Sequence, residues 1–309
     1  AGLAHQVSGI PIVEGLSLGT AFSRVDLIVN RQTKRVIRSK LHAPRDICAY
    51  RTPDAHACAG EDVQESGVPV QYEGRPVSAD PRIVSAMAPA LARVRARQAV
   101  PLGVVLDTPI GREGDLESPL GNLFARAMRE STPGADLAIN NNRVGGLRAD
   151  LPAGPLTFGH LYDVFPFDDR LVQLTVTGAQ LRAIFATDVR RERRGALGVS
   201  GISIRATCSQ QGLQIELSHA SGRPIADTDR LALVTTDLLV RGTVFASLTG
   251  PERTQVPPSA PIAREVVAAW LERRGGRLSA GEFFDPTTPH WHPFDAHVSR
   301  CVAARLNTR

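Results

Sequence analysis

The strongest constraint on the fold lies in the middle of the chain, where apolar runs and capped amphipathic helices follow one another from residue 101 onward. Ser118 and Pro119 predict a helix start, because serine caps the first-turn amides and proline fits the first helical position. That helix has one apolar face, formed by Leu120, Leu123, Phe124, Ala127 and Met128. Thr177 and Gln180 predict a capping box at the start of a further helix.

The segments around these helices read as strands. Apolar runs predict strands in VPLGVVLDTPI, ADLAIN, LVQLTVT, VSGISIRA, LQIEL and RLALVTT. Thr157 is a cap candidate for a short helix, FGHLYDVF, and residues 262–275 predict an amphipathic closing helix. Strands and helices mix without strict alternation, so the fold class is α+β or mixed α/β.

The first hundred residues carry weaker signals. Residues 1–40 predict strands with a hairpin return, and residues 41–80 predict a long loop because they are rich in proline, glycine and aspartate. Residues 81–98 predict a helix that starts at Pro81 and kinks at Pro89. We expect this helix to mark the boundary between two units.

The net charge of +5 comes almost entirely from arginine, since Lys34 and Lys40 are the only lysines among 36 basic residues. A biased base composition and a preference for phosphate-bearing ligands both explain this usage. The arginines are scattered rather than gathered in one stripe, so we do not expect a nucleic-acid binder. No apolar run reaches the length of a membrane span.

The four cysteines fit no zinc-binding spacing. Cys48 and Cys58 bracket a short loop, so either a disulfide in an oxidising compartment or two free thiols is compatible with the sequence. Cys208 and Cys301 are candidates for a second pair.

Residues 140–171 concentrate the candidates for ligand binding. Gly145 and Gly146 allow a ligand to approach the backbone, and the guanidinium of Arg148 suits phosphate or carboxylate oxygens. Asn142 offers an amide, and the ring of Phe167 suits stacking on a planar base. The alternative is that Arg148 pairs with a core carboxylate and that Phe167 is simply part of the core.

The order of motifs over about residues 101–250 resembles the C-terminal domain of the 5′-nucleotidase family. The resemblance rests on ESPLGNLFARAM and on GGLRADLPAGPLTFGHLYDVFPFDDRLVQLTVTGAQL. The first forty residues resemble the end of that family's metallophosphatase domain. The resemblance implies three parts: a truncated, β-rich metallophosphatase remnant over residues 1–80, a linker helix over 81–100 and the C-terminal domain over 101–309.

The resemblance also implies a substrate-binding role for six positions, which are Asn122, Asn142, Gly145, Gly146, Arg148 and Phe167. In the family two phenylalanines sandwich the base, and Phe167 matches one of them. Leu238 stands where the second would be, and Val244 stands where an aspartate would bind the ribose. We therefore expect nucleotide binding to be weak, altered or absent.

The metal site of the family is reduced to one candidate ligand. Gly2, Leu3, Ala4 and His5 occupy the positions of a Gly-His-x-His motif, so His5 alone survives. Intact family members are expected to use divalent ions such as Zn²⁺ or Mn²⁺, but the Asp-x-His and Gly-Asn-His motifs that complete the centre are missing here. We assign no catalytic residue and expect no cofactor in this chain.

The resemblance implies a 5′-nucleotidase-like protein of nucleotide catabolism, which recognises substrate for a metal-dependent phosphohydrolase but is catalytically incomplete. Its expected partners are a nucleotide or other small anion and a separate metallophosphatase segment. The alternatives are a non-catalytic nucleotide- or anion-binding module (a pseudoenzyme) and a relative acting on a sugar phosphate or sulfur ester. The usual location of the family and the Cys48–Cys58 pair favour a periplasmic or secreted location, and we expect no signal peptide within this chain.

His160 and a group of C-terminal histidines have weaker functional interpretations. His160 is expected to face or cap a helix rather than to act in catalysis. His290, His292 and His297 cluster with Asp295 and could bind a metal, but a packed C-terminal segment explains them as well.

Overall fold

The structure is a computed structural model that describes residues 2–16, 19–52, 58, 67–114, 117–142, 146–192, 197–245, 248, 256–294, 298 and 301. The chain divides into two compact units, Ala1–Leu91 and Ala92–Arg309. The division falls within helix α1 (Pro81–Gln98), close to the boundary expected from the sequence.

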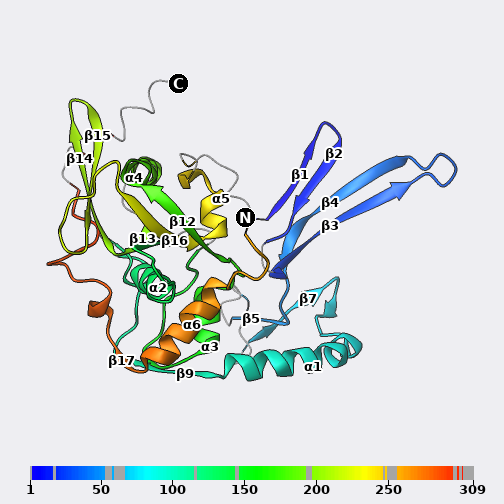
Figure 1. Cartoon of the computed structure of the whole chain (residues 1–309). Coiled ribbons are helices and arrows are strands. Elements are labelled where there is room, and N and C mark those ends of the chain that lie inside the picture. Colours follow the sequence, from blue (N-terminus) through cyan, green and yellow to red (C-terminus); the bar gives the residue numbers. More distant parts are fainter. Residues whose placement is uncertain are drawn as a thin grey trace. The chain divides into compact units, whose positions relative to one another are not determined.

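The first unit consists of antiparallel strand pairs. Strand β1 (Leu3–Val7) pairs with β2 (Ile10–Glu14), and β3 (Ala21–Val29) pairs with β4 (Val36–Asp46) in the long hairpin of Figure 1. These hairpins confirm the strands expected in residues 1–40. Gly9 has a φ of 80° in the β1–β2 turn, a conformation that favours glycine.

The prediction of one long loop over residues 41–80 is wrong. Strand β4 continues to Asp46 because its second half pairs with the start of β3, a contact that periodicity within the segment does not reveal. Four short strands follow, which are β5 (Tyr50–Arg51), β6 (Val68–Pro69), β7 (Gln71–Tyr72) and β8 (Arg75–Pro76).

Helix α1 has the predicted bounds and runs through Pro89. None of its residues is buried, and its apolar side chains Ile83, Met87, Leu91 and Val94 are all exposed. The same is true of the strands before it, where Ala21 is the only buried hydrophobic residue among the described residues of the first unit. These elements therefore carry exposed apolar side chains that the first unit itself does not cover.

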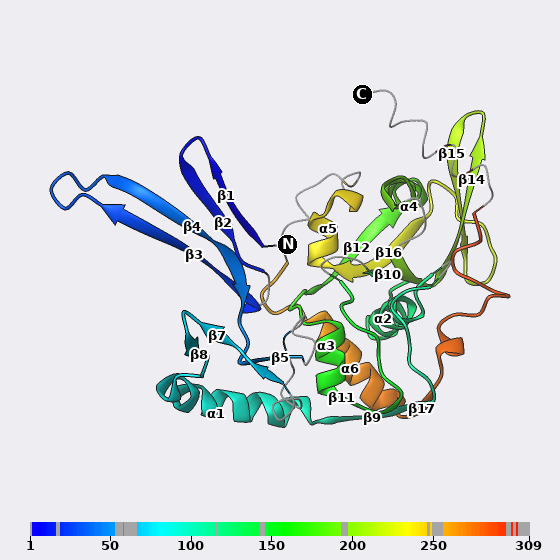
Figure 2. The same cartoon turned by 180° about the vertical axis from the view of Figure 1, so that it is seen from behind.

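The described residues of the second unit form three sheets, whose strands are labelled in Figures 1 and 2. The largest has the order β12-β16-β10-β13 and contains β12 (Leu171–Thr177), β16 (Arg230–Thr236), β10 (Leu137–Asn141) and β13 (Leu197–Ser200). A second sheet has the order β11-β9-β17 and contains β11 (Gly154–Thr157), β9 (Pro101–Leu106) and β17 (Gly276–Leu278). The third is an antiparallel hairpin of β14 (Ile202–Ser209) and β15 (Gly212–His219).

The described part of the second unit contains five α-helices, and all of them except the fourth follow the sequence signals closely. They are α2 (Pro119–Glu130), α3 (Phe158–Val164), α4 (Gly178–Glu192), α5 (Asp237–Arg241) and α6 (Ala263–Arg274), with 3-10 turns η3 (Thr243–Phe245) and η5 (Ala280–Glu282). Ser118 Oγ accepts the amide of Gly121 at 2.8 Å, which confirms the N-cap of α2. The Thr177–Gln180 capping box is also present. The mixed α/β class is thus confirmed.

Two hydrophobic clusters hold the second unit together. One surrounds helices α2, α3 and α6, of which α3 and α6 lie side by side in both views (Figures 1 and 2). The other packs α4 against the four-stranded sheet and the β14–β15 hairpin. Helix α2 approaches β13 very closely, since a Cβ on Gly198 would lie 2.4 Å from the backbone of Gly121. Only glycine fits there, so the start of α2 is fixed in place.

Two disulfides, Cys48–Cys58 and Cys208–Cys301, link the four cysteines as the expected pairs. Disulfides persist in oxidising compartments, so the pairs fit a secreted location. Within the described residues, no helix has the length and apolarity needed to cross a membrane.

Candidate functional site

Arg148 lies on a loop whose backbone is fixed while its side chain is exposed. The Arg148 N–H donates to the carbonyl of Val164 at 2.8 Å, and its own carbonyl accepts from the Arg112 guanidinium at 2.7 Å. Within the described residues, the Arg148 guanidinium makes no hydrogen bond or ion pair, so it is not paired inside the core. Gly146 is buried beside it, and Gly145 falls outside the described residues.

Phe167 is half-buried and is held by a buried guanidinium. Its ring packs edge-on against Phe165, with the centroids 5.5 Å apart. Arg264, only 5% exposed, donates to the carbonyls of Phe165 and Phe167 at 3.1 and 2.9 Å, and pairs with Asp168 at 2.7 Å. Arg264 therefore fixes the backbone that carries the candidate stacking ring, a role that no local sequence signal identified.

The segment after Phe167 is hydrogen-bonded to helix α5. The Arg170 N–H donates to the Asp237 carboxylate at 2.9 Å, and the Asp237 N–H donates to the Arg170 carbonyl at 2.9 Å. Leu238, the next residue, is exposed, whereas Val244 is half-buried against the second cluster. Leu238 stands where the family resemblance places a second stacking ring. The segment that carries Leu238 is thus hydrogen-bonded to the segment that carries Phe167.

Asn122 is buried, and its amide is fully engaged in holding helix α2. Its Nδ2 donates to Glu117 and to the carbonyl of Phe283, each at 2.9 Å, and its Oδ1 accepts the Val199 amide at 3.1 Å. This geometry is that of a scaffold residue. A direct contact between Asn122 and substrate stays a prediction.

Asn142 lies against the first turn of the same helix. A Cβ on Gly121 would fall 2.1 Å from Asn142 Oδ1, so glycine makes room for this side chain. Asn140 Nδ2 donates to Asn142 Oδ1 at 3.1 Å. The structure therefore places Asn142 and Asn122 at the first turn of α2. The Arg148 backbone is bonded to Val164 at the end of α3, and Phe167 follows three residues after Val164.

The C-terminal histidines His290 and His292 contact different residues. The buried Glu117 carboxylate accepts the His290 amide at 3.0 Å and lies 3.3 Å from His290 Nδ1, whereas His292 contacts Ser203 and Arg205 on the hairpin. Asp295 and His297 lie outside the described residues. His160 accepts the Thr157 amide at 3.2 Å, which confirms its capping role.

The described residues do not fit a dinuclear metal centre. His5 is exposed on β1, and Leu3 lies two residues before it on the same strand. No group of three or more metal-ligating side chains occurs in the described part of the chain. His5 as a surviving ligand stays a prediction.

Asp169 has a perturbed carboxyl beside Phe167. Its burial, followed by the nearby carboxylates of Asp237 and Asp168, raises its pKa from 3.8 to about 6, and Arg241 acts in the opposite direction. Both burial and like charge disfavour the ionised form. The folded protein therefore binds this proton more tightly than the unfolded chain, and the stability contributed by the group declines as the pH rises from about 4 to about 6.

Asp169→Asn is expected to stabilise the protein at pH 8 by up to about 1 kcal/mol, because the half-exposed site is screened by solvent. At pH 4 the variant and the wild type should unfold at nearly the same temperature, since both then carry a neutral group. Thermal unfolding by circular dichroism from pH 4 to pH 8 measures this, with Asp163→Asn as the control for removing one exposed charge. A gain that is equal at all pH values would contradict the assignment.

Comparison with known proteins identifies the class of domain that carries this site. Residues 101–247 match the family described as 5′-nucleotidase, C-terminal domain, so this part of the chain is such a domain. Endonuclease YhcR of Bacillus subtilis (strain 168) is 25% identical over 238 residues, which are 77% of this chain and 17% of that protein. The trifunctional nucleotide phosphoesterase protein YfkN of the same organism is 28% identical over 130 residues, which are 38% of this chain and 9% of that protein.

Solved structures share the fold at low sequence identity. The 5′-nucleotidase precursor from Thermus thermophilus gives a TM-score of 0.51 at 19% identity, covering 89% of this chain and 52% of that one. The NAD nucleotidase NadN of Haemophilus influenzae gives 0.54 at 16% identity, covering 95% of this chain and 57% of that one. The chain thus spans little more than half the length of these structures and under a fifth of the length of YhcR and YfkN.

Proposed function

We propose that this chain recognises a nucleoside monophosphate or a similar small anionic nucleotide for a metal-dependent phosphohydrolase. One observation carries the proposal: the exposed Arg148 guanidinium makes no hydrogen bond or ion pair among the described residues, yet its backbone is fixed on both sides. A guanidinium held this way is available for phosphate oxygens without a large loss of order on binding. The half-buried ring of Phe167 follows the segment to which Arg148 is bonded and is available for stacking on the base.

The metal centre in this proposal belongs to a metallophosphatase segment that is not among these 309 residues. When bound there, the ions would activate water and stabilise the charge on the phosphoryl oxygens. The exposed apolar side chains on β1–β4 and α1 support such a partner, because uncovered apolar surfaces of this kind are typical of interfaces. Arg148 and Phe167 would bind and orient the substrate. The two disulfides support a secreted or periplasmic location.

A second candidate is a non-catalytic binding module. The observation that favours it is the pair of departures at α5 and η3, where aliphatic Leu238 and Val244 replace a stacking ring and a carboxylate. Losing one face of a base stack weakens binding by about 1–3 kcal/mol. The two candidates differ in whether phosphate is released when a metallophosphatase segment is present.

Arg148→Ala is expected to weaken binding of adenosine monophosphate by about 10- to 100-fold, because charge-assisted hydrogen bonds to phosphate are lost. Adenosine, which has no phosphate, should bind the variant and the wild type equally. Isothermal titration calorimetry on the full chain measures both ligands, with Arg190→Ala as the control for an exposed arginine elsewhere. Unchanged affinity for the monophosphate in Arg148→Ala would overturn the proposal.

The catalytic part of the proposal is tested by phosphate release with Mn²⁺ or Zn²⁺. We expect none from this chain alone, and release when a metallophosphatase segment is joined to it. Release from the chain alone would show that the metal ligands are complete within it. No release from the joined protein, with binding intact, would favour the non-catalytic module.

A further inference from the structure

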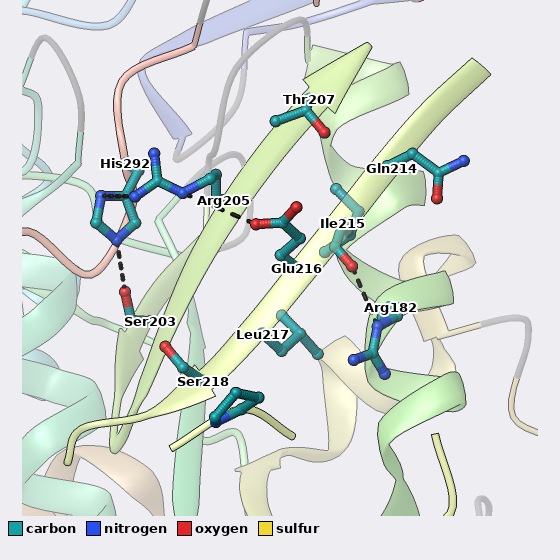
Figure 3. A pocket seen from close by; sticks show the side chains of 11 residues that line it. Arg182, Ser203, Arg205, Thr207, Gln214, Ile215, Glu216, Leu217, Ser218 and His292 are labelled. Carbon is teal, nitrogen blue, oxygen red and sulfur yellow. Dashed lines mark hydrogen bonds and ion pairs between the residues drawn. The ribbon is translucent and has the colours of Figure 1, made fainter. Parts of the chain in front are cut away.

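A second polar site lies on the hairpin of β14 and β15, away from the Arg148 loop in the sequence and in its contacts. The cavity has a volume of about 570 Å³ (Figure 3). We call it the hairpin groove and define it by six residues that line it, which are Arg182, Ser203, Arg205, Glu216, Ser218 and His292. None of these six residues belongs to the candidate nucleotide site.

The register of the hairpin explains why polar groups gather here. Ser203 lies opposite Ser218, and Arg205 lies opposite Glu216, so these side chains share one face of the two strands. The alternate positions are buried, as in the pair Ile204 and Leu217. The hairpin therefore has an apolar face toward the core and a polar face that forms the groove.

The C-terminal segment completes the groove by pairing with β14. The Ile204 amide donates to the carbonyl of His290 at 2.7 Å, and the His292 amide donates to the carbonyl of Ile204 at 2.9 Å. Trp291, between the two histidines, is fully buried and donates to the carbonyl of Leu197 at 3.0 Å. The imidazole of His292 is thus set beside the polar face by backbone pairing and by a buried anchor.

The contacts of His292 fix the direction of its hydrogen bonds. Arg205 Nη2 lies 3.2 Å from His292 Nδ1, and Ser203 Oγ lies 3.1 Å from His292 Nε2. Because a guanidinium only donates, Nδ1 must accept and Nε2–H must donate to Ser203. The ring is neutral in this arrangement, and burial, followed by the Arg205 charge, holds the pKa of His292 below its ordinary value, against a weaker opposite effect of Glu117.

The groove therefore contains hydrogen-bond donors that have no acceptor among the described residues. The Ser203 hydroxyl oxygen accepts a hydrogen bond from His292, so the O–H group is available to donate. This O–H group has no acceptor in the described part of the chain. Arg205 donates one N–H to His292 and forms an ion pair with Glu216, whose Oε2 lies 3.9 Å from the Arg205 Nε. That distance is longer than a hydrogen bond, so the other N–H groups of Arg205 remain available to donate. Arg182, by contrast, is engaged with the carbonyls of Ile215 and Ile225 and with Asp227, and so belongs to the scaffold.

We propose that the hairpin groove binds a small oxyanion, either a carboxylate or a phosphate group, through Arg205 and the Ser203 hydroxyl. His292 is a positioning residue: it holds both donors in one hydrogen-bonded chain (Figure 3). The size of the groove fits a small metabolite that carries such a group, with Ser218 available for a second polar contact. This site is separate from the proposed nucleotide site and does not depend on it.

The test is a titration of the full chain, with its disulfides intact, with inorganic phosphate and with succinate at constant ionic strength set by chloride. The ring signals of His292 are followed by nuclear magnetic resonance and assigned with His292→Asn. We expect saturable shifts with at least one of the two anions, weakened about tenfold or more in Arg205→Gln and less strongly in Ser203→Ala. Arg148→Gln is expected to leave this binding unchanged.

Saturation by phosphate alone assigns phosphate-bearing ligands to the groove, and saturation by succinate alone assigns carboxylates. A shift that does not saturate with either anion, or one that is equal in Arg205→Gln, would overturn the proposal. Circular dichroism and thermal unfolding establish that Arg205→Gln is folded, and Arg223→Gln, on the turn after β15, is the matched control for loss of a nearby surface charge. Loss of binding in Arg148→Gln would show that the anion occupies the other site instead.

Discussion

Trp291→Ala is expected to lower the free energy of unfolding by about 3–5 kcal/mol, because it removes a large, fully buried ring and leaves a cavity. The ring meets Phe185 and Phe294 edge-on, with centroids 5.5 and 6.2 Å apart. Its Nε1–H donates to the Leu197 carbonyl, which would lose this partner. The expected loss is a large part of the total stability of an ordinary domain.

Urea unfolding followed by far-ultraviolet circular dichroism measures this loss. Trp291→Phe separates the contributions, because it keeps an aromatic ring but removes the hydrogen bond, and we expect it to cost about 1–2 kcal/mol. If the free energy of unfolding of Trp291→Ala lay within about 1 kcal/mol of the wild-type value, the C-terminal segment would not be anchored as the structure places it.

Arg264→Met is expected to destabilise the protein by about 3 kcal/mol and to weaken nucleotide binding at the same time. The substitution leaves the carbonyls of Phe165 and Phe167 without their buried donor, and loss of a buried charged partner costs several kcal/mol. Because the same guanidinium fixes the backbone of Phe167, the stacking ring would also lose its orientation.

Arg97→Met is the matched control for Arg264→Met. Both guanidinium groups lie over the ring of Phe158, at 3.8 Å for Arg97 and 5.9 Å for Arg264. The side chain of Arg97, however, is 50% exposed and pairs with a surface glutamate, so its loss should cost at most about 1 kcal/mol. Unfolding and calorimetry with adenosine monophosphate on both variants measure the difference. Equal effects would mean that burial of Arg264 is unimportant.

Local signals predicted the second unit well because its helices carry their own start markers. Ser118 and Thr177 each accept the amide three residues later, so a cap read in the sequence is a bond in the structure. The first unit was harder to predict, because its strands are defined by partners rather than by their own pattern. Residues 41–46 contain a proline and alternate poorly, yet they complete β4 by pairing with β3. The helix predicted over residues 81–98 is present as α1, but the sequence did not show that its apolar side chains would be exposed.

The sequence indicated Arg148 and Phe167 as candidates for the site but not the residues that hold their surroundings in place. Arg148 and Phe167 stand out in the sequence because glycines and prolines surround them. Arg264 and Glu117 do not stand out, since each acts through residues far away in the chain: Arg264 on Phe167, and Glu117 on His290. One arginine among many scattered arginines carries no sign that it is buried. Such supporting residues become visible only when the chain is folded.

The Cys208–Cys301 bond closes a covalent ring in the last third of the protein, with a sequence separation of 93 between its two cysteines. A single protease cut inside that ring produces two pieces that remain one molecule until a thiol is added. In the chain-entropy treatment, closing a ring of this size restricts the unfolded chain by about 4–5 kcal/mol. The hairpin and the C-terminal segment that share the groove would therefore separate most readily under reducing conditions.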